Sequence, residues 1–191
     1  MILILDGNNG VGKSEYAKLL AKKLKWPIVR PFRNANTDIH LGYEGVTEHL
    51  RKQLRVPANT HVDDVYVADI LAATGMHAIL DRSMPSAIAY GKMHNEMDGW
   101  YDIPGRSKEL LEYWQSILKT ADCFYVWLTA PRGVSKERCG DRWCPNKKQW
   151  DQLERVFINS FMTISLPKRQ IDTSEIEISD GVESICRALR N

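Results

Sequence analysis

Apolar and polar residues follow one another along the chain in blocks that predict strands and helices in turn. Five short apolar or β-prone runs favour strands, at residues 2–5, 27–30, 77–81, 123–129 and 169–172. The segments between them carry apolar residues at helical spacing. Strands that alternate with helices form a parallel sheet with helices on both faces. The pattern therefore predicts a three-layer α/β fold around a five-stranded parallel sheet.

The helical spacing itself is found in seven segments. After the first predicted strand, Ala17, Leu20, Ala21 and Leu24 recur on one face. Further helices are expected at residues 46–56, 62–73, 85–96 and 150–164, in a segment capped by Ser107, and at the C-terminus with Asp180 and Glu183 in capping-box spacing. The stretch 132–148 is too polar for such a helix, and we expect it to be mobile. No repeat or linker divides residues 1–191, so we expect a single domain.

The clearest chemical motif follows the first predicted strand. Gly7 to Ser14 fits G-x-x-x-x-G-K-[ST], between a buried strand and an amphipathic helix. Glycines let the backbone wrap around a polyphosphate, Lys13 would reach the β- and γ-phosphates, and Ser14 would ligate Mg²⁺. This predicts a P-loop NTPase fold that binds ATP with Mg²⁺ through Gly7, Asn8, Gly10, Val11, Gly12, Lys13 and Ser14.

Composition and charge argue against nucleic acids and membranes as partners. A net charge of +2 lacks the strong basic bias of nucleic-acid binders, and no apolar run approaches a membrane span. Because the first strand begins at Ile2, the sequence leaves no room for a signal peptide, and we expect a cytoplasmic protein with small nucleotides as partners. The sequence favours thiols at its four cysteines over a zinc site at Cys139 and Cys144.

A P-loop alone does not decide between kinases, GTPases and ATPases. The guanine motif N-K-x-D and the switch motif D-x-x-G of GTPases are both absent from the sequence. Three arginines, Arg132, Arg138 and Arg142, fall in the polar segment 132–148. A closing lid could bring Arg138 and Arg142 onto the phosphates, which favours a small phosphotransferase.

The segment 81–90, Asp-Arg-Ser-Met-Pro-Ser-Ala-Ile-Ala-Tyr, resembles the D-R-[YH]-x-x-S-x-x-A-Y segment of thymidylate kinases. Residues 31–33 and 140–142 are similar to the loop after strand two and to the lid of that family. The resemblance implies transfer of the γ-phosphate of ATP to a deoxynucleoside monophosphate. It also implies that Asp81 helps to bind Mg²⁺ and that Arg82 and Arg33 bind the acceptor phosphate. Ser86 and Tyr90 would lie along the acceptor nucleoside.

Two departures from that family concern the acceptor. Asn9 stands where the family usually has an acid near the acceptor sugar and phosphate, and Ile70 replaces the arginine that packs on thymine. Asp69 shares a helical stripe with apolar residues, so we expect it to face inward, toward an acceptor hydroxyl or an internal arginine. The base and the sugar of the acceptor therefore stay open, as does the oligomeric state, a homodimer included.

Two alternatives remain. Gly7-Asn8 and Arg82-Ser83 also resemble deoxynucleoside kinases, which need a carboxylate base in the loop after strand two. That loop has Arg30 and Arg33 and no acid before Asp38, which suits an acceptor that is already anionic. An ATP-binding regulatory protein is the alternative from another class, and the arginines of the segment 132–148 argue against it.

Overall fold

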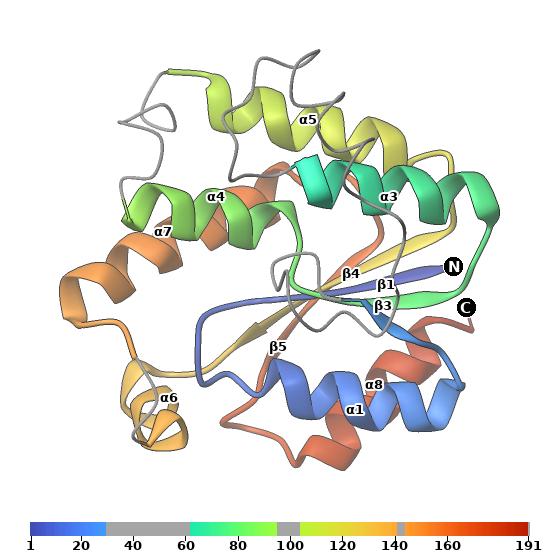
Figure 1. The fold of residues 1–191 in the computed structure, drawn as a ribbon. Helices are drawn as coiled ribbons and strands as arrows, with labels where there is room; N and C mark the ends of the chain where they lie inside the picture. Colours follow the sequence, from blue (N-terminus) through green and yellow to red (C-terminus); the bar gives the residue numbers. More distant parts are fainter. Residues whose placement is uncertain (30–61, 95–103, 141–143, 191) are drawn as a thin grey trace.

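The computed structural model describes residues 1–29, 62–94, 104–140 and 144–190. A single sheet of five parallel strands runs through the centre (Figure 1), in the order β2-β3-β1-β4-β5. The strands are β1 Ile2–Asp6, β2 Ile28–Val29, β3 Ala78–Asp81, β4 Cys123–Thr129 and β5 Lys168–Asp172. The predicted five-stranded parallel sheet is therefore confirmed.

Helices cover both faces of this sheet. Figure 1 shows α1 and α8 on one face, and α3, α4, α5 and α7 on the other. The helices are α1 Lys13–Leu24, α3 Val62–Thr74, α4 Met84–Met93, α5 Arg106–Leu118, α6 Arg132–Cys139, α7 Lys147–Thr163 and α8 Ile178–Ala188. None of these described helices is long and apolar enough to cross a membrane. The helix expected at residues 46–56 lies outside the described residues.

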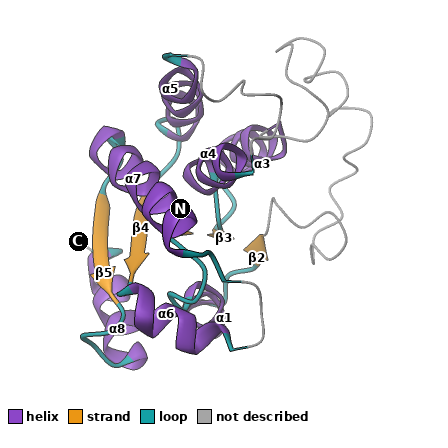
Figure 2. Ribbon diagram, turned by 90° about the vertical axis from the view of Figure 1, so that its left-hand side faces the viewer, coloured by secondary structure: helices purple, strands orange, loops and turns teal. Residues whose placement is uncertain are grey.

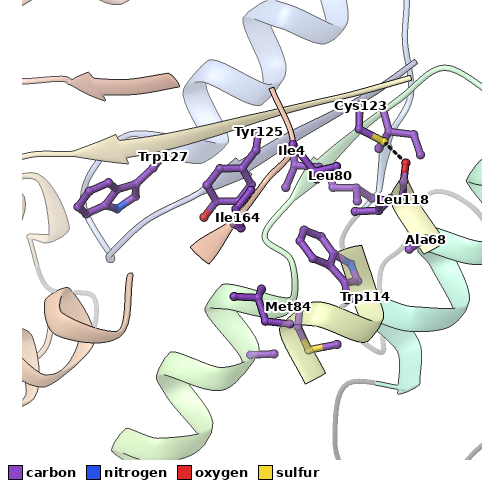
Figure 3. Close-up of a cluster of buried hydrophobic side chains, with 14 of the residues drawn as sticks. Ile4, Ala68, Leu80, Met84, Trp114, Leu118, Cys123, Tyr125, Trp127 and Ile164 are labelled. Atoms are coloured by element: carbon purple, nitrogen blue, oxygen red, sulfur yellow. Dashed lines mark hydrogen bonds between the residues drawn. The ribbon is translucent and has the colours of Figure 1, made fainter. Parts of the chain in front are cut away.

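The central strand β1 supplies side chains to two separate cores. Ile2 and Ile4 pack with the helices α3, α4, α5 and α7, whereas Leu3 and Leu5 pack with α1 and α8. Figure 3 shows the first core, in which Trp114 of α5 is completely buried. The sequence of a strand that is buried on both faces is a continuous apolar run, and for this reason β1 was predictable.

Three helix starts differ from the prediction. Helix α7 begins at Lys147, because Asn146 and Gln149 form a capping box. Helix α5 follows Gly105, so Ser107 lies inside the helix and is not its cap. Helix α8 has Glu177 as its N-cap, so the expected capping box of Asp180 and Glu183 is wrong.

The segment expected to be mobile and irregular contains the helix α6. Its buried side is narrow: only Ser135 and Cys139, one turn apart, are buried, while four of its eight residues are exposed. A helix this short with so few buried positions gives no recognisable periodic pattern, so this helix was not predicted, and the expected mobility stays a prediction. The four cysteines are thiols, as expected, and among the described residues no group of three His, Cys, Asp or Glu side chains could hold a metal ion.

Candidate active site

The turn between β1 and α1 has the backbone of a phosphate-binding loop. Gly7, Gly10 and Gly12 have φ values of 141°, 79° and 88°, a region that favours glycine. A Cβ atom at Gly7 would lie 2.1 Å from the carbonyl oxygen of Leu128, and one at Gly10 would lie 2.2 Å from that of Ser135. Glycine is thus required at these two positions by conformation and by space. Gly12 is the N-cap of α1, whose first amides therefore border the turn.

Lys13 closes the loop on itself. Its Nζ atom is buried and donates hydrogen bonds to the carbonyl oxygens of Gly7 at 2.8 Å and Asn8 at 2.6 Å. Burial, followed by the charge of Arg82, lowers the pKa of Lys13 to about 7. A polyphosphate beside this ammonium group would favour its charged form, so the site is electrostatically prepared for an anion.

Ser14 and Asp81 bring two oxygen ligands together at the start of α1. The Ser14 hydroxyl donates to Oδ2 of Asp81 at 3.3 Å, and both residues line the same cavity. Asp81 ends β3, which pairs with β1 so that Leu5 is opposite Asp81. A hydroxyl and a carboxylate are the hard oxygen ligands that Mg²⁺ prefers, so the residues fit that ion.

Arg82, Asn9 and Tyr90 form a polar cluster beside the loop. Arg82 Nη2 donates to Oδ1 of Asn9 at 2.6 Å, and the Tyr90 hydroxyl donates to the same oxygen at 3.0 Å. The guanidinium carbon lies 4.7 Å from the centre of the Tyr90 ring. Burial raises the pKa of Tyr90, so its hydroxyl stays protonated and donates. Arg82 is thereby fixed in one direction, toward the P-loop.

One cavity of about 1150 Å³ joins these groups. The loop and Ser14 line it together with Asp81, Arg82 and Tyr90, and a second group of lining residues comes from the end of α6 and from residues 173–180. Arg138 of α6 lines the cavity and donates to Oγ1 of Thr173 at 2.8 Å and to its carbonyl oxygen at 2.9 Å. The structure therefore brings Arg138 to the cavity, while Arg33 and Arg142 lie outside the described residues.

Two predicted acceptor residues do not line this cavity. Ser86 is completely buried and donates its hydroxyl to Asp6, which places it beneath the site. Asp69 is exposed on α3, so the expectation that it faces inward is wrong. The helix instead directs Ala68 and Leu71 into the core.

Sequence reasoning missed two acids next to the loop. Asp6, the last residue of β1, is buried and accepts hydrogen bonds from Ser83 and Ser86. Glu154 of α7 accepts from Nδ2 of Asn8 at 2.8 Å, and burial raises the pKa of its carboxyl group. An acid that ends a wholly apolar strand could have drawn attention to Asp6. Glu154 gives no local signal, because its partner is 146 residues away.

Neither a family model nor a curated protein matches the sequence. The fold is similar to that of the YorR protein from Bacillus subtilis in complex with phosphorylated GDP, at 20% identity and a TM-score of 0.61, covering 100% of this chain and 96% of that chain. It is also similar to deoxyadenosine kinase from M. mycoides with bound dATP, at 15% identity and a TM-score of 0.62, covering 100% of both chains.

A third similar structure is thymidylate kinase from Candida albicans, at 16% identity and a TM-score of 0.55, covering 99% of this chain and 90% of that chain. At such identities the likeness establishes the fold. The described residues have the fold of the P-loop kinases, as predicted, and the arginine-containing lid stays a prediction.

Proposed function

We propose that this chain is an ATP-dependent nucleoside monophosphate kinase, which transfers the γ-phosphate of ATP to a deoxynucleoside monophosphate. One observation carries the proposal: the P-loop with Lys13 and the cluster of Arg82, Asn9 and Tyr90 line the same cavity. A phosphate donor at the loop and an anionic acceptor at Arg82 would therefore meet. The similar kinase folds support this class of reaction.

More of the described residues belong to the proposed donor half of the site than to the acceptor half. The loop amides and Lys13 would bind the β- and γ-phosphates, and Arg138 would add a positive charge from α6. Ser14 and Asp81 would hold Mg²⁺, which neutralises phosphate charge when bound. The part of the cavity lined by residues 173–180 offers room for the donor nucleoside.

The acceptor half depends on the charge of Arg82. Its partner Asn9 contributes an amide oxygen, which carries no net charge, so this contact leaves the guanidinium charge to attract an anion. Arg33 would add a second cation, as the resemblance implies, and Tyr90 would lie along the acceptor nucleoside. An oxygen of the acceptor phosphate then attacks the γ-phosphorus in line, and ADP leaves. An anionic oxygen needs no general base for this attack.

A deoxynucleoside kinase is the second candidate, and several similar structures are deoxyadenosine kinases. That reaction requires a carboxylate to accept the proton of a sugar hydroxyl. Among the described residues of the cavity, the carboxylate adjacent to Arg82 is Asp81, to which we assign Mg²⁺. The described part of the site thus favours the monophosphate. Cytoplasmic location and a homodimer stay predictions.

The proposal is tested by measuring ADP release from Mg-ATP with each deoxynucleoside and each deoxynucleoside monophosphate. We expect turnover with one or more monophosphates. The base that is accepted would show whether the absence of an arginine at Ile70 has changed the preference away from thymine. Turnover with nucleosides alone would favour the second candidate. Binding of ATP without turnover on any acceptor would favour a regulatory protein.

A further inference from the structure

Asp6 is a buried carboxylate that has no part in the chemistry proposed above. It is the last residue of β1, directly before Gly7, and it is not among the residues that line the cavity. A carboxylate inside a protein is unfavourable unless hydrogen bonds or opposite charges compensate it. The partners of Asp6 should therefore show why the chain has an acid at this position.

Two hydrogen bonds to Asp6 come from the acceptor side of the site. Ser83 donates its hydroxyl to Oδ2 of Asp6, and Ser86 donates to Oδ1, so each carboxylate oxygen has one bond from this segment. Ser83 is the N-cap of α4, yet its hydroxyl makes no capping bond to that helix. A serine at this position usually caps, and here its hydroxyl is committed to Asp6 instead.

The residue before Ser83 is Arg82, which has an unfavourable backbone. Its φ of 84° lies in the left-handed region, which is costly for a residue with a Cβ atom. The Arg82 N–H donates to the carbonyl oxygen of Leu5 at 2.9 Å. Two consecutive residues of β1 thus fix the backbone around Arg82: Leu5 binds the N–H of Arg82, and Asp6 binds the hydroxyl of Ser83. The conformation fixed in this way directs the guanidinium group toward Asn9.

We propose that Asp6 is a positioning residue, which holds the turn of Arg82 against the P-loop so that the acceptor is aligned with the donor. Asp6 touches neither substrate and acts through Ser83 and Ser86. The inference rests on the proposed function. Because the donor phosphates are held by loop amides and Lys13, loss of the Asp6 bonds should affect the acceptor far more than the donor.

The test uses Asp6→Asn and Ser83→Ala, singly and together, in the full chain at pH 8. Three quantities are measured: the Kd of Mg-ATP without acceptor, and the KM and kcat for the best monophosphate. We expect each single variant to lower kcat/KM for the acceptor about tenfold, as for a lost bond to a charged group. Ser83→Ala leaves the Asp6 charge beside Lys13 in place, so it should change the Kd of Mg-ATP by less than about twofold. The double variant should be no less active than Asp6→Asn alone, because both changes act on the bond between Ser83 and Asp6.

Two further variants separate positioning from folding. Ser83→Thr keeps the hydroxyl and should restore most of the lost kcat/KM. Ser160→Ala removes another buried serine, in α7, and should leave kcat/KM unchanged. The unfolding temperature of every variant is recorded, since a merely structural role would lower it without changing the acceptor KM.

Additive losses in the double variant, an equal loss of donor and acceptor binding, or unchanged kcat/KM in Ser83→Ala would overturn the role of Asp6. These results require an active wild-type chain. A wild-type chain without turnover on any acceptor would instead overturn the proposed function, and the inference with it. The two failures are therefore distinguished by the wild-type rate.

Discussion

The amide oxygen of Asn9 links the two halves of the site, because it accepts from both Arg82 and Tyr90. The thymidylate kinases that the sequence resembles usually have an acid at this position. An acid would pair with Arg82 as a full charge, whereas the amide orients the guanidinium without neutralising it. At the scale of single residues, this contact leaves the positive charge of Arg82 for the acceptor that we propose.

Lys13 is the cation of the P-loop on the proposed donor side. We expect Lys13→Ala to lower turnover at least about a hundredfold, because stabilisation of the transition-state charge is lost. Lys18→Ala is the matched control: Lys18 lies on the same helix, is exposed and pairs with Glu15 at the surface. Steady-state turnover with saturating ATP checks the prediction, and near-normal turnover of Lys13→Ala would contradict it.

Arg33 is predicted to bind the acceptor phosphate, although it lies outside the described residues. Arg33→Ala should raise the acceptor KM and leave the Kd of Mg-ATP unchanged, because one of two cations for the acceptor is removed. Initial rates at varied acceptor concentration give the KM. If the KM is that of the wild type, Arg33 has no place in the site.

At the scale of elements, α6 is part of the P-loop's support. Ser135 of α6 lies against Gly10, and Arg138 is bonded to Thr173 beyond β5. In Figure 2, α6 lies at the end of the sheet toward which the arrows of β4 and β5 point. The first half of the predicted lid is therefore a helix in contact with the loop, and closure of the remainder onto the phosphates stays a prediction.

The contact between Gly10 and α6 can be tested with two glycine variants. Gly10→Ala should lower the affinity for Mg-ATP at least about tenfold, because the Cβ atom would lie 2.2 Å from the carbonyl oxygen of Ser135 at a φ of 79°. Gly133→Ala, in α6, has no atom within 4 Å of the new Cβ and should bind Mg-ATP like the wild type. Titration calorimetry measures both, and wild-type affinity in Gly10→Ala would show that the loop can move away from α6.

Elements with a strong local pattern were predictable, and those fixed by distant contacts were not. The fourth strand, Cys123–Thr129, has the predicted bounds because it is one uninterrupted run without a charged residue, in which most residues are β-branched or aromatic. The P-loop motif likewise predicted the turn and the start of α1. By contrast, the role of Asp6 depends on Ser83 and Ser86, which are 77 and 80 residues away. No periodic pattern in the sequence reports such a pairing.

At the scale of the whole molecule, the strand order explains why the site is where it is. With β1 between β3 and β4, the P-loop after β1 is adjacent to the Asp81-Arg82 turn after β3 and to the segment after β4. Active sites of parallel sheets lie at the carboxyl ends of such strands. The sequence predicted this convergence, while the order of the strands required the three-dimensional structure.

Asp6 also links the site to the stability of the whole molecule. Burial raises the pKa of Asp6 from an ordinary 3.8 to about 7, despite opposing effects of Ser83, Ser86, Lys13 and Arg82. Burial, followed by the nearby charge of this carboxyl group, raises the pKa of Tyr125 of β4. The folded state therefore binds the Asp6 proton more tightly than the unfolded state does. The stability that this proton contributes is fully present below about pH 4 and is lost as the pH rises to about 7.

Asp6→Asn removes this titration. The free energy of unfolding of the variant should therefore rise relative to that of the wild type between pH 4 and 7, and the difference should then stay constant. Urea unfolding of both chains at several pH values measures the difference. Parallel stability curves of the two chains across this range would contradict the assignment.

The central claim, phosphoryl transfer to an anionic nucleotide, is tested most directly by following the label from γ-labelled ATP. Each deoxynucleoside monophosphate is compared with the nucleoside of the same base, and the labelled product is identified by chromatography. We predict that the label moves from ATP to a deoxynucleoside diphosphate in the wild type and not in Lys13→Ala. Label in a nucleoside monophosphate made from the nucleoside, or in inorganic phosphate alone, would contradict the account.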